Sequence, residues 1–163
     1  MKKAMFLLAT VLIGGMMLSG CKKPTPTPEP TPEPEPTPTT TIVLYKVENT
    51  NGNLVMSDCF KLNVTYTNAN GESVTETGVV VPWSKSVDVT LPFHAKMEGE
   101  LVYNENELPE HVVFGKRYGI GTYFNGSLSI EMVGGFNSAS KENFLNLMQD
   151  HPDRLKFTTE KDF

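Results

Sequence analysis

Residues 60–81 read FKLNVTYTNANGESVTETGVVV, two runs of strand-forming residues joined by a turn. Apolar side chains occupy every second position of the first run, the period of a strand that is buried on one face: Phe60, Leu62, Val64 and Tyr66. Asn70-Gly71 supplies the positive φ that a tight turn needs. Residues 72–81 are therefore expected to return as the antiparallel partner of the first run, and Pro82-Trp83 is expected to end that partner strand.

The same period extends to both sides of this hairpin. The clearest alternation runs from Phe93 to Tyr103, with charged residues between the apolar ones. Glycines at 115, 119 and 121 indicate a bulge or a close approach to a neighbouring segment. Phe124-Asn125-Gly126-Ser127 predicts a second tight turn. The other segments that read as strands are residues 42–47, 86–91, 111–114, 117–124 and 128–132, the last with Leu128, Ile130 and Met132 on one face.

The C-terminal part follows a different period. Ser140 is a good N-cap for a helix over residues 141–149, which would place Phe144, Leu147 and Met148 on one side. His151-Pro152 ends that pattern, and residues 155–158 suggest a last strand. The helix is expected to cover an end or an edge of the sheet and protect it from pairing with other chains.

Seven or eight short strands separated by turn signals predict an all-β fold over residues 41–163. The expected architecture is an antiparallel β-sandwich with one short C-terminal helix. A small β-barrel is the alternative, because periodicity does not determine whether a sheet closes on itself.

Two motifs near the first hairpin resemble a known domain. Residues 66–71, followed by Val81-Pro82-Trp83-Ser84-Lys85, are similar to the immunoglobulin-like domain of small Bacteroidetes envelope lipoproteins, and more distantly to MmpS-type accessory proteins of mycobacterial lipid exporters. Residues 118–121 resemble the small-residue strand near the end of that domain. The resemblance implies an immunoglobulin-like sandwich without catalytic residues. The long segment 93–114 and the helix after residue 138 depart from the family pattern.

The N-terminus predicts a lipid anchor. Leu18-Ser19-Gly20-Cys21 resembles the lipobox of bacterial lipoproteins, and the basic and apolar residues before it make residues 1–20 a signal peptide. Cleavage would leave Cys21 as the lipidated first residue. A short uncleaved anchor is the alternative. Lipidation of Cys21 leaves Cys59 alone, so no intrachain disulfide is expected.

A proline-rich tether is expected to separate the lipid from the domain. Residues 22–40 alternate Thr-Pro and Glu-Pro without any apolar side chain, so the lipidated Cys21 and this stretch form one segment, 21–40. Alternating prolines favour polyproline II, and residues 24–40 would reach on the order of 50 Å. A proline-rich ligand for a partner domain is the rival interpretation.

The predicted location is the outer membrane, through the lipid. Surface lipoproteins of Bacteroidetes often carry acidic residues directly after the lipidated cysteine, whereas this chain has Lys22 and Lys23 there. Both the periplasmic and the surface face therefore stay open.

Charge and motifs exclude several classes of function. The chain has 14 basic and 19 acidic residues, so it lacks the basic clusters that bind nucleic acid. The three histidines have no metal-ligand spacing, the acidic region 98–110 has no EF-hand pattern, and no nucleophile elbow, P-loop or dinucleotide fingerprint occurs. No catalytic residues, metal or cofactor are predicted.

What remains is a binding role. Four aromatic residues are candidates for a glycan-stacking or partner-binding surface: Trp83, Tyr103, Tyr118 and Tyr123. The sequence therefore predicts a non-catalytic envelope module that binds a protein or glycan or serves a structural role. The alternative is an accessory subunit of an envelope transporter.

Overall fold

The computed structural model describes residues 38–163. The predicted signal peptide, the lipobox with Cys21, and the tether up to residue 37 lie outside the described residues. The first strand begins at Thr40, next to the predicted start of the domain at residue 41.

The alternating run at residues 60–67 forms one strand of the predicted hairpin. Strands β4 (Phe60–Thr67) and β5 (Ser73–Val79) pair antiparallel, with Thr67 opposite Ser73. The four alternate apolar side chains of β4 are buried, as predicted. In the turn, the side-chain oxygen of Asn68 accepts hydrogen bonds from the N–H groups of Asn70 and Glu72. This Asx-type closure fixes the register of the hairpin.

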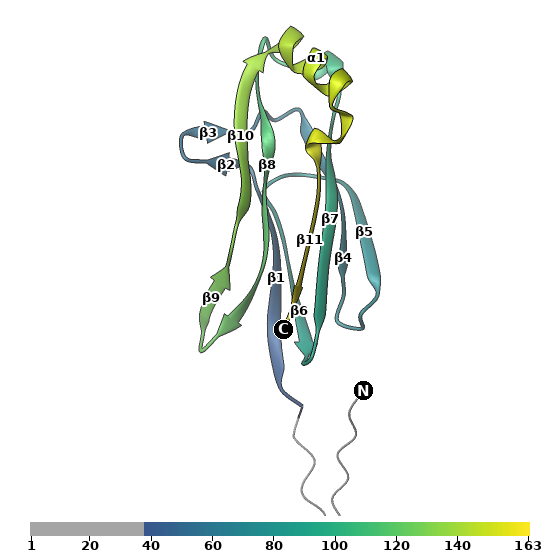
Figure 1. The fold of residues 1–163 in the computed structure, drawn as a ribbon, viewed down its shortest axis with the longest axis vertical. Coiled ribbons are helices and arrows are strands. Elements are labelled where there is room, and N and C mark those ends of the chain that lie inside the picture. The colour runs from purple at the N-terminus through teal and green to yellow at the C-terminus, as the bar shows by residue number, and fades with distance from the viewer. Residues whose placement is uncertain (1–37) are drawn as a thin grey trace, which may run out of the picture. The chain divides into compact units, whose positions relative to one another are not determined.

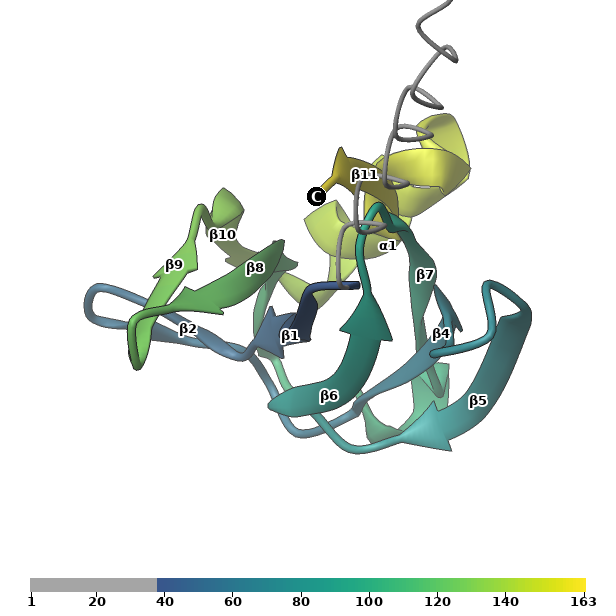
Figure 2. The ribbon, with the colours of Figure 1, turned by 90° about the horizontal axis from the view of Figure 1, so that it is seen from below.

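Two antiparallel sheets face each other (Figures 1 and 2). Sheet 1 has five strands in the order β10-β8-β1-β6, with β9 also paired to β8: β1 (Thr40–Glu48), β6 (Trp83–Thr90), β8 (His111–Phe124), β9 (Ser127–Ile130) and β10 (Val133–Ser140). Sheet 2 has four strands in the order β11-β7-β4-β5, adding β7 (His94–Tyr103) and β11 (Lys156–Asp162). A small ribbon of β2 (Thr50–Asn51) and β3 (Leu54–Val55) projects from sheet 1.

The topology is immunoglobulin-like. In that fold strands B and E are neighbours in one sheet, and C and F are neighbours in the other. Here β1 pairs with β6, β4 pairs with β7, and the chain crosses between the sheets after β1, β5, β6, β7 and β10. Strand β8 lies beside β1, where an N-terminal strand A lies in the standard fold. The predicted antiparallel sandwich with one short C-terminal helix is confirmed, and the barrel alternative is wrong.

The core lies between the sheets and continues to the end at which the helix lies. Strand β1 presents Val43, Tyr45 and Val47 to it, each with no exposed surface. Tyr45 keeps its hydroxyl satisfied by donating to the carbonyl of Thr67 at 2.8 Å. Burial raises the pKa of Tyr45 to about 12, so this hydroxyl stays protonated.

The helix forms where its cap predicts it. Helix α1 (Lys141–Asp150) begins after Ser140, whose hydroxyl accepts a hydrogen bond from the N–H of Asn143. Phe144 and Met148 are buried. The helix lies across the end of the sandwich opposite the start of β1 (Figure 1). Short 3-10 turns, Glu105–Glu107 and Pro152–Leu155, flank this end.

Three segments differ from the sequence prediction. Strand β8 runs unbroken through Gly115, which has φ +145° and would place a Cβ 2.2 Å from the carbonyl oxygen of Gly135. Strand β10 was not predicted, because its glycine- and serine-rich sequence has no clear alternation. The β2–β3 ribbon was also missed, since two-residue strands leave no period to detect.

Candidate functional site

Aromatic side chains fill the end of the sandwich beneath α1. Phe144 has no exposed surface, and its ring lies 4.9 Å from those of Tyr103 and Phe114 and 5.8 Å from that of Phe60, measured between centroids. All three contacts have edge-on geometry, which is favourable for aromatic pairs. These contacts fix the helix over the last residues of β7.

A groove runs between the end of β7 and the helix. It consists of two adjoining cavities of about 250 and 390 Å³, which share Tyr103 and Met148. We call it the α1 groove. The larger cavity is bounded by Glu105 and by Leu145, Asn146 and Gln149 of the helix; the smaller one is bounded by residues 100–102, Pro152 and Leu155.

The groove has an apolar floor and a polar rim. Met148 and Leu155 are buried, whereas Asn146 and Gln149 are exposed. Burial raises the pKa of Tyr103, and the nearby Glu105 carboxylate raises it further, so its hydroxyl is a neutral hydrogen-bonding group. The floor can accept an apolar side chain of a ligand, and the polar groups of the rim can form hydrogen bonds with the atoms around that side chain. Ligand sites commonly combine these two features.

The Trp83 side chain is buried inside the sandwich rather than exposed at its surface. It is 8% exposed and packs on Tyr66, with centroids 5.7 Å apart. Its indole N–H donates to Glu76 at 2.9 Å. The face that a sugar would stack on is therefore covered by the protein.

The remaining aromatic candidates lie in separate places. Tyr118 stacks on Phe157 at 4.3 Å, where β8 meets β11. Tyr123 is 39% exposed and lies near the far end of β8. Within residues 38–163, no ring contact joins two of the four candidates, and only Tyr103 lines the α1 groove.

Several charged side chains form local ion pairs. Glu98 binds Lys96 at 2.9 Å, and His94 lies 2.7 Å from Asp162. Across the described part of the chain, no group of three or more His, Cys, Asp or Glu side chains is placed to hold a metal ion. Cys59 is free and buried, and burial raises the pKa of its thiol.

The sequence pattern predicted a candidate residue on one wall of the groove and none on the other. Tyr103 was a candidate, but the helix residues Leu145, Asn146 and Gln149 were not. A signal existed, because these three share a helix face beside the buried stripe of Phe144 and Met148. That face carries one apolar residue and two uncharged amides, whereas the solvent-exposed face of a helix typically carries charged residues.

Two comparisons with known proteins found no match to this chain. The chain matches no protein-family model, and no curated protein matches it significantly. No helix between residues 38 and 163 is long and apolar enough to span a membrane.

Proposed function

We propose that this chain is a lipid-anchored protein of the outer membrane whose β-sandwich is a non-catalytic binding module for a protein partner. The observation that carries the proposal is the α1 groove, which offers an apolar floor of Met148 and Leu155 within a rim of amides and carboxylates. A protein partner suits this groove better than a glycan, because the apolar side chains of Met148 and Leu155 form its floor. Trp83, the strongest stacking residue among the candidates, lies outside the groove and is buried.

The position of the groove supports this role. Strand β1 starts at one end of the sandwich and α1 lies at the opposite end (Figure 1). A chain that enters the domain from a lipidated tether would therefore hold the α1 groove on the side that points away from the lipid. A long stiff tether would extend that reach further.

Two asparagines of α1 provide a matched test. Asn146 lines the groove and Asn143 does not, although both are exposed and lie one turn apart. A photo-crosslinking amino acid placed at position 146 of the full chain should capture a defined protein in the native envelope, and the same probe at 143 should not. Binding of that purified protein should fall at least about tenfold in Asn146→Arg and stay unchanged in Asn143→Arg.

Each result has a distinct meaning. Equal capture at both positions, or equal binding by both Arg variants, would contradict the groove as the site. Capture of transporter subunits alone would favour the accessory-subunit role. Glycan-array binding that is lost in Asn146→Arg, with the fold intact, would favour a glycan ligand in the groove.

The anchor is tested separately. Cys21→Ala should release the protein from washed membranes, and a variant that still partitions wholly with membranes would contradict lipid attachment at Cys21. Treating intact cells with a broad protease then distinguishes the faces: loss of the domain indicates the surface, and protection until lysis indicates the periplasm.

A further inference from the structure

The outer face of sheet 1 carries an apolar patch formed by three strands and by Met132, which lies between β9 and β10. Tyr123 pairs with Leu128, and Gly121 pairs with both Ile130 and Leu44. Residues that lie directly opposite each other point to the same face of a sheet. Because Val43 and Tyr45 point into the core, these residues point outward. The patch, here called the sheet 1 patch, consists of Ile42, Leu44, Tyr123, Leu128, Ile130 and Met132.

Two glycines shape this patch. A Cβ at Gly121 would lie 2.5 Å from the Cβ of Ile130, and a Cβ at Gly119 would lie 3.1 Å from the sulfur of Met132. The two apolar side chains thus occupy the space above glycines of β8. Leu44 is only 9% exposed although it faces outward, because its neighbours on this face cover it.

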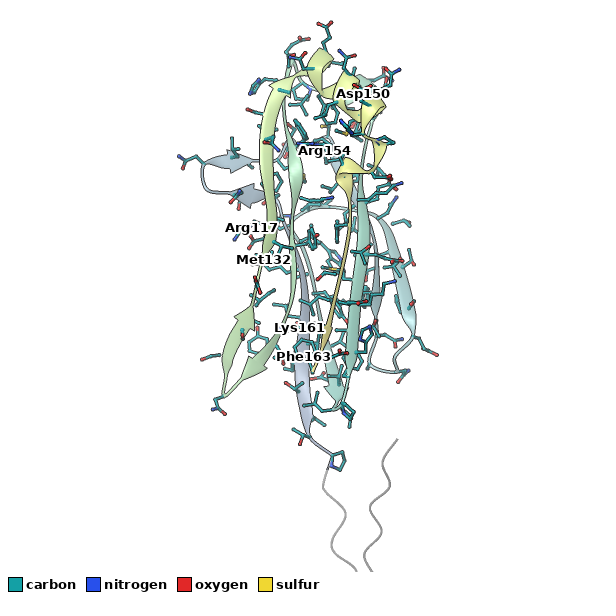
Figure 3. The ribbon with its side chains drawn as sticks, viewed as in Figure 1. Arg117, Met132, Asp150, Arg154, Lys161 and Phe163 are labelled. Atoms are coloured by element: carbon teal, nitrogen blue, oxygen red, sulfur yellow. The ribbon has the colours of Figure 1, made fainter. Side chains whose placement is uncertain are left out.

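The centre of the patch is exposed and uncharged. Ile42 is 38% exposed, and Tyr123 and Leu128 are each 39% exposed. Asp88, opposite Ile42, is the charged residue at one border. At the other border Glu48 accepts from both Lys46 and Arg117 at 2.7 Å, and Figure 3 shows Arg117 and Met132 close together at mid-height. A contiguous apolar patch of this kind marks an interaction surface.

We propose that the sheet 1 patch binds a second copy of this chain. Strand β9 and the paired parts of β1 and β8, which carry the patch, lie along the side of the sandwich toward the end where β1 starts (Figure 1). A two-fold axis parallel to the strands would join two patches face to face and leave both N-terminal ends on the same side. This arrangement places both tethers on the side of one membrane without either having to pass along its domain, a step that rests on the proposed anchor.

The same geometry disfavours a bilayer as the occupant of the patch. A bilayer would meet the end of the domain rather than the side of a sheet. An acidic chain normally repels a second copy, but the uncharged centre of the patch removes that repulsion where contact is closest. Anchoring in one membrane also raises the local concentration of the chain, so a modest patch suffices for pairing.

The two-fold axis predicts specific neighbours. With β8 at the axis, Tyr123 lies beside Tyr123 of the second copy, and Leu128 faces Ile42 of the second copy. A benzophenone amino acid in place of Tyr123, in the full lipidated chain in its native membrane, should give a product of twice the chain's mass that contains this sequence alone. The same probe in place of Thr75, on the outer face of sheet 2, should give none.

Charge substitutions complete the test. Leu128→Asp should lower the crosslinked fraction at least about fivefold, and Ile42→Asp on another strand should do the same. Ser127→Asp adds the same charge one position away, toward the other face, and should leave crosslinking unchanged. Thermal unfolding of each variant verifies the fold. A product with lipid or with another protein, no product above the Thr75 control, or a dimer insensitive to both substitutions would overturn the proposal.

Discussion

The sandwich is closed by different chemistry on its two open sides. On the β5/β6 side, a carboxylate and three polar or aromatic side chains form a hydrogen-bonded network. On the β8/β11 side, two aromatic rings stack between the sheets. The same two-layer architecture therefore depends on charge and hydrogen bonding along one side and on apolar packing along the other.

The β5/β6 side is organised by Glu76. Its side chain points inward from an edge strand and accepts from Trp83 at 2.9 Å, from Lys85 at 3.2 Å and from Tyr66 at 3.3 Å. Lys85 also lies 5.6 Å from the centre of the Tyr66 ring. An inward-pointing charge on an edge strand deters pairing with other chains, so this network both closes the sandwich and protects its edge.

The β8/β11 side is organised by Phe157. Its ring is buried and lies nearly parallel to that of Tyr118, at an interplanar angle of 21°. Gly99, opposite Phe157 on β7, makes room for it, because a Cβ there would lie 2.6 Å from the ring. One aromatic residue thus joins the edge strand β11 to the facing sheet, because the residue opposite it on β7 has no side chain.

The largest expected effect is on the stacked side. Phe157→Ala removes the ring that bridges the sheets and should lower the free energy of unfolding by about 3–5 kcal/mol, measured by denaturant titration. Thr158→Ala, the next residue on the same strand and exposed, should change it by less than about 0.5 kcal/mol. A loss below about 1 kcal/mol in Phe157→Ala would show that the stack does not hold this side together.

A second substitution tests the space above Gly99. Gly99→Ala should destabilise the chain by about 2 kcal/mol, since the new methyl group meets both the Phe157 ring and the backbone of Asn63. In the Phe157→Ala background the cost should shrink, because the ring is gone. Equal costs in both backgrounds, in a double-mutant cycle, would assign the strain to the backbone contact alone.

A smaller effect is expected on the networked side. Trp83→Phe keeps an aromatic ring but removes the donor to Glu76, which retains Lys85 and Tyr66. The free energy of unfolding should fall by about 1 kcal/mol, less than in Phe157→Ala. If Trp83→Phe is the more damaging of the two, the contrast between the sides is reversed.

The smallest effect is a dependence on pH. The hydrogen bond from Trp83, and then those from Lys85 and Tyr66, hold the pKa of Glu76 below its ordinary value of 4.5. Because the folded carboxyl has the lower pKa, its stabilisation is present above the unfolded pKa and is lost as the pH falls through the folded pKa. The stability advantage of the native chain over Glu76→Gln should therefore decline below about pH 4.5.

The Trp83→Phe variant provides the control for this measurement. In Trp83→Phe the pH-dependent difference should be smaller, because the largest cause of the lowered pKa is gone. A difference that does not vary between about pH 6 and pH 3, in urea titrations of both proteins, would show that Glu76 is not stabilised by its network.

Local signals in the sequence were sufficient for many elements. The β4–β5 hairpin, strand β7 and the capped helix were predicted because alternation, Asn-Gly turns and a serine cap act within a few residues. The missed strand β10 shows the limit: its glycines follow from close approach to β8, where a Cβ at Gly134 would lie 2.1 Å from the carbonyl oxygen of Lys116. Such a contact depends on a neighbouring strand and leaves no local period.

The candidate site also combines features that local sequence predicts with features that depend on contacts between distant segments. Tyr103 was chosen from its type and strand position, but its groove exists only because α1 packs across the end of β7. The four candidates are all aromatic, but they lie in different parts of the fold. Which of them is buried, stacked or exposed follows from sheet order, and sheet order involves residues far apart in the chain.

The sequence was sufficient for most of the strands, the turns, the helix cap and the fold class, since these follow from side-chain period and backbone preference. The tertiary structure alone decided the rest: the pairing of β1 with β8, the α1 groove, the apolar patch on sheet 1 and the two kinds of side closure. These features arise from contacts between segments many residues apart, and a period along the chain carries no information about which strands become neighbours.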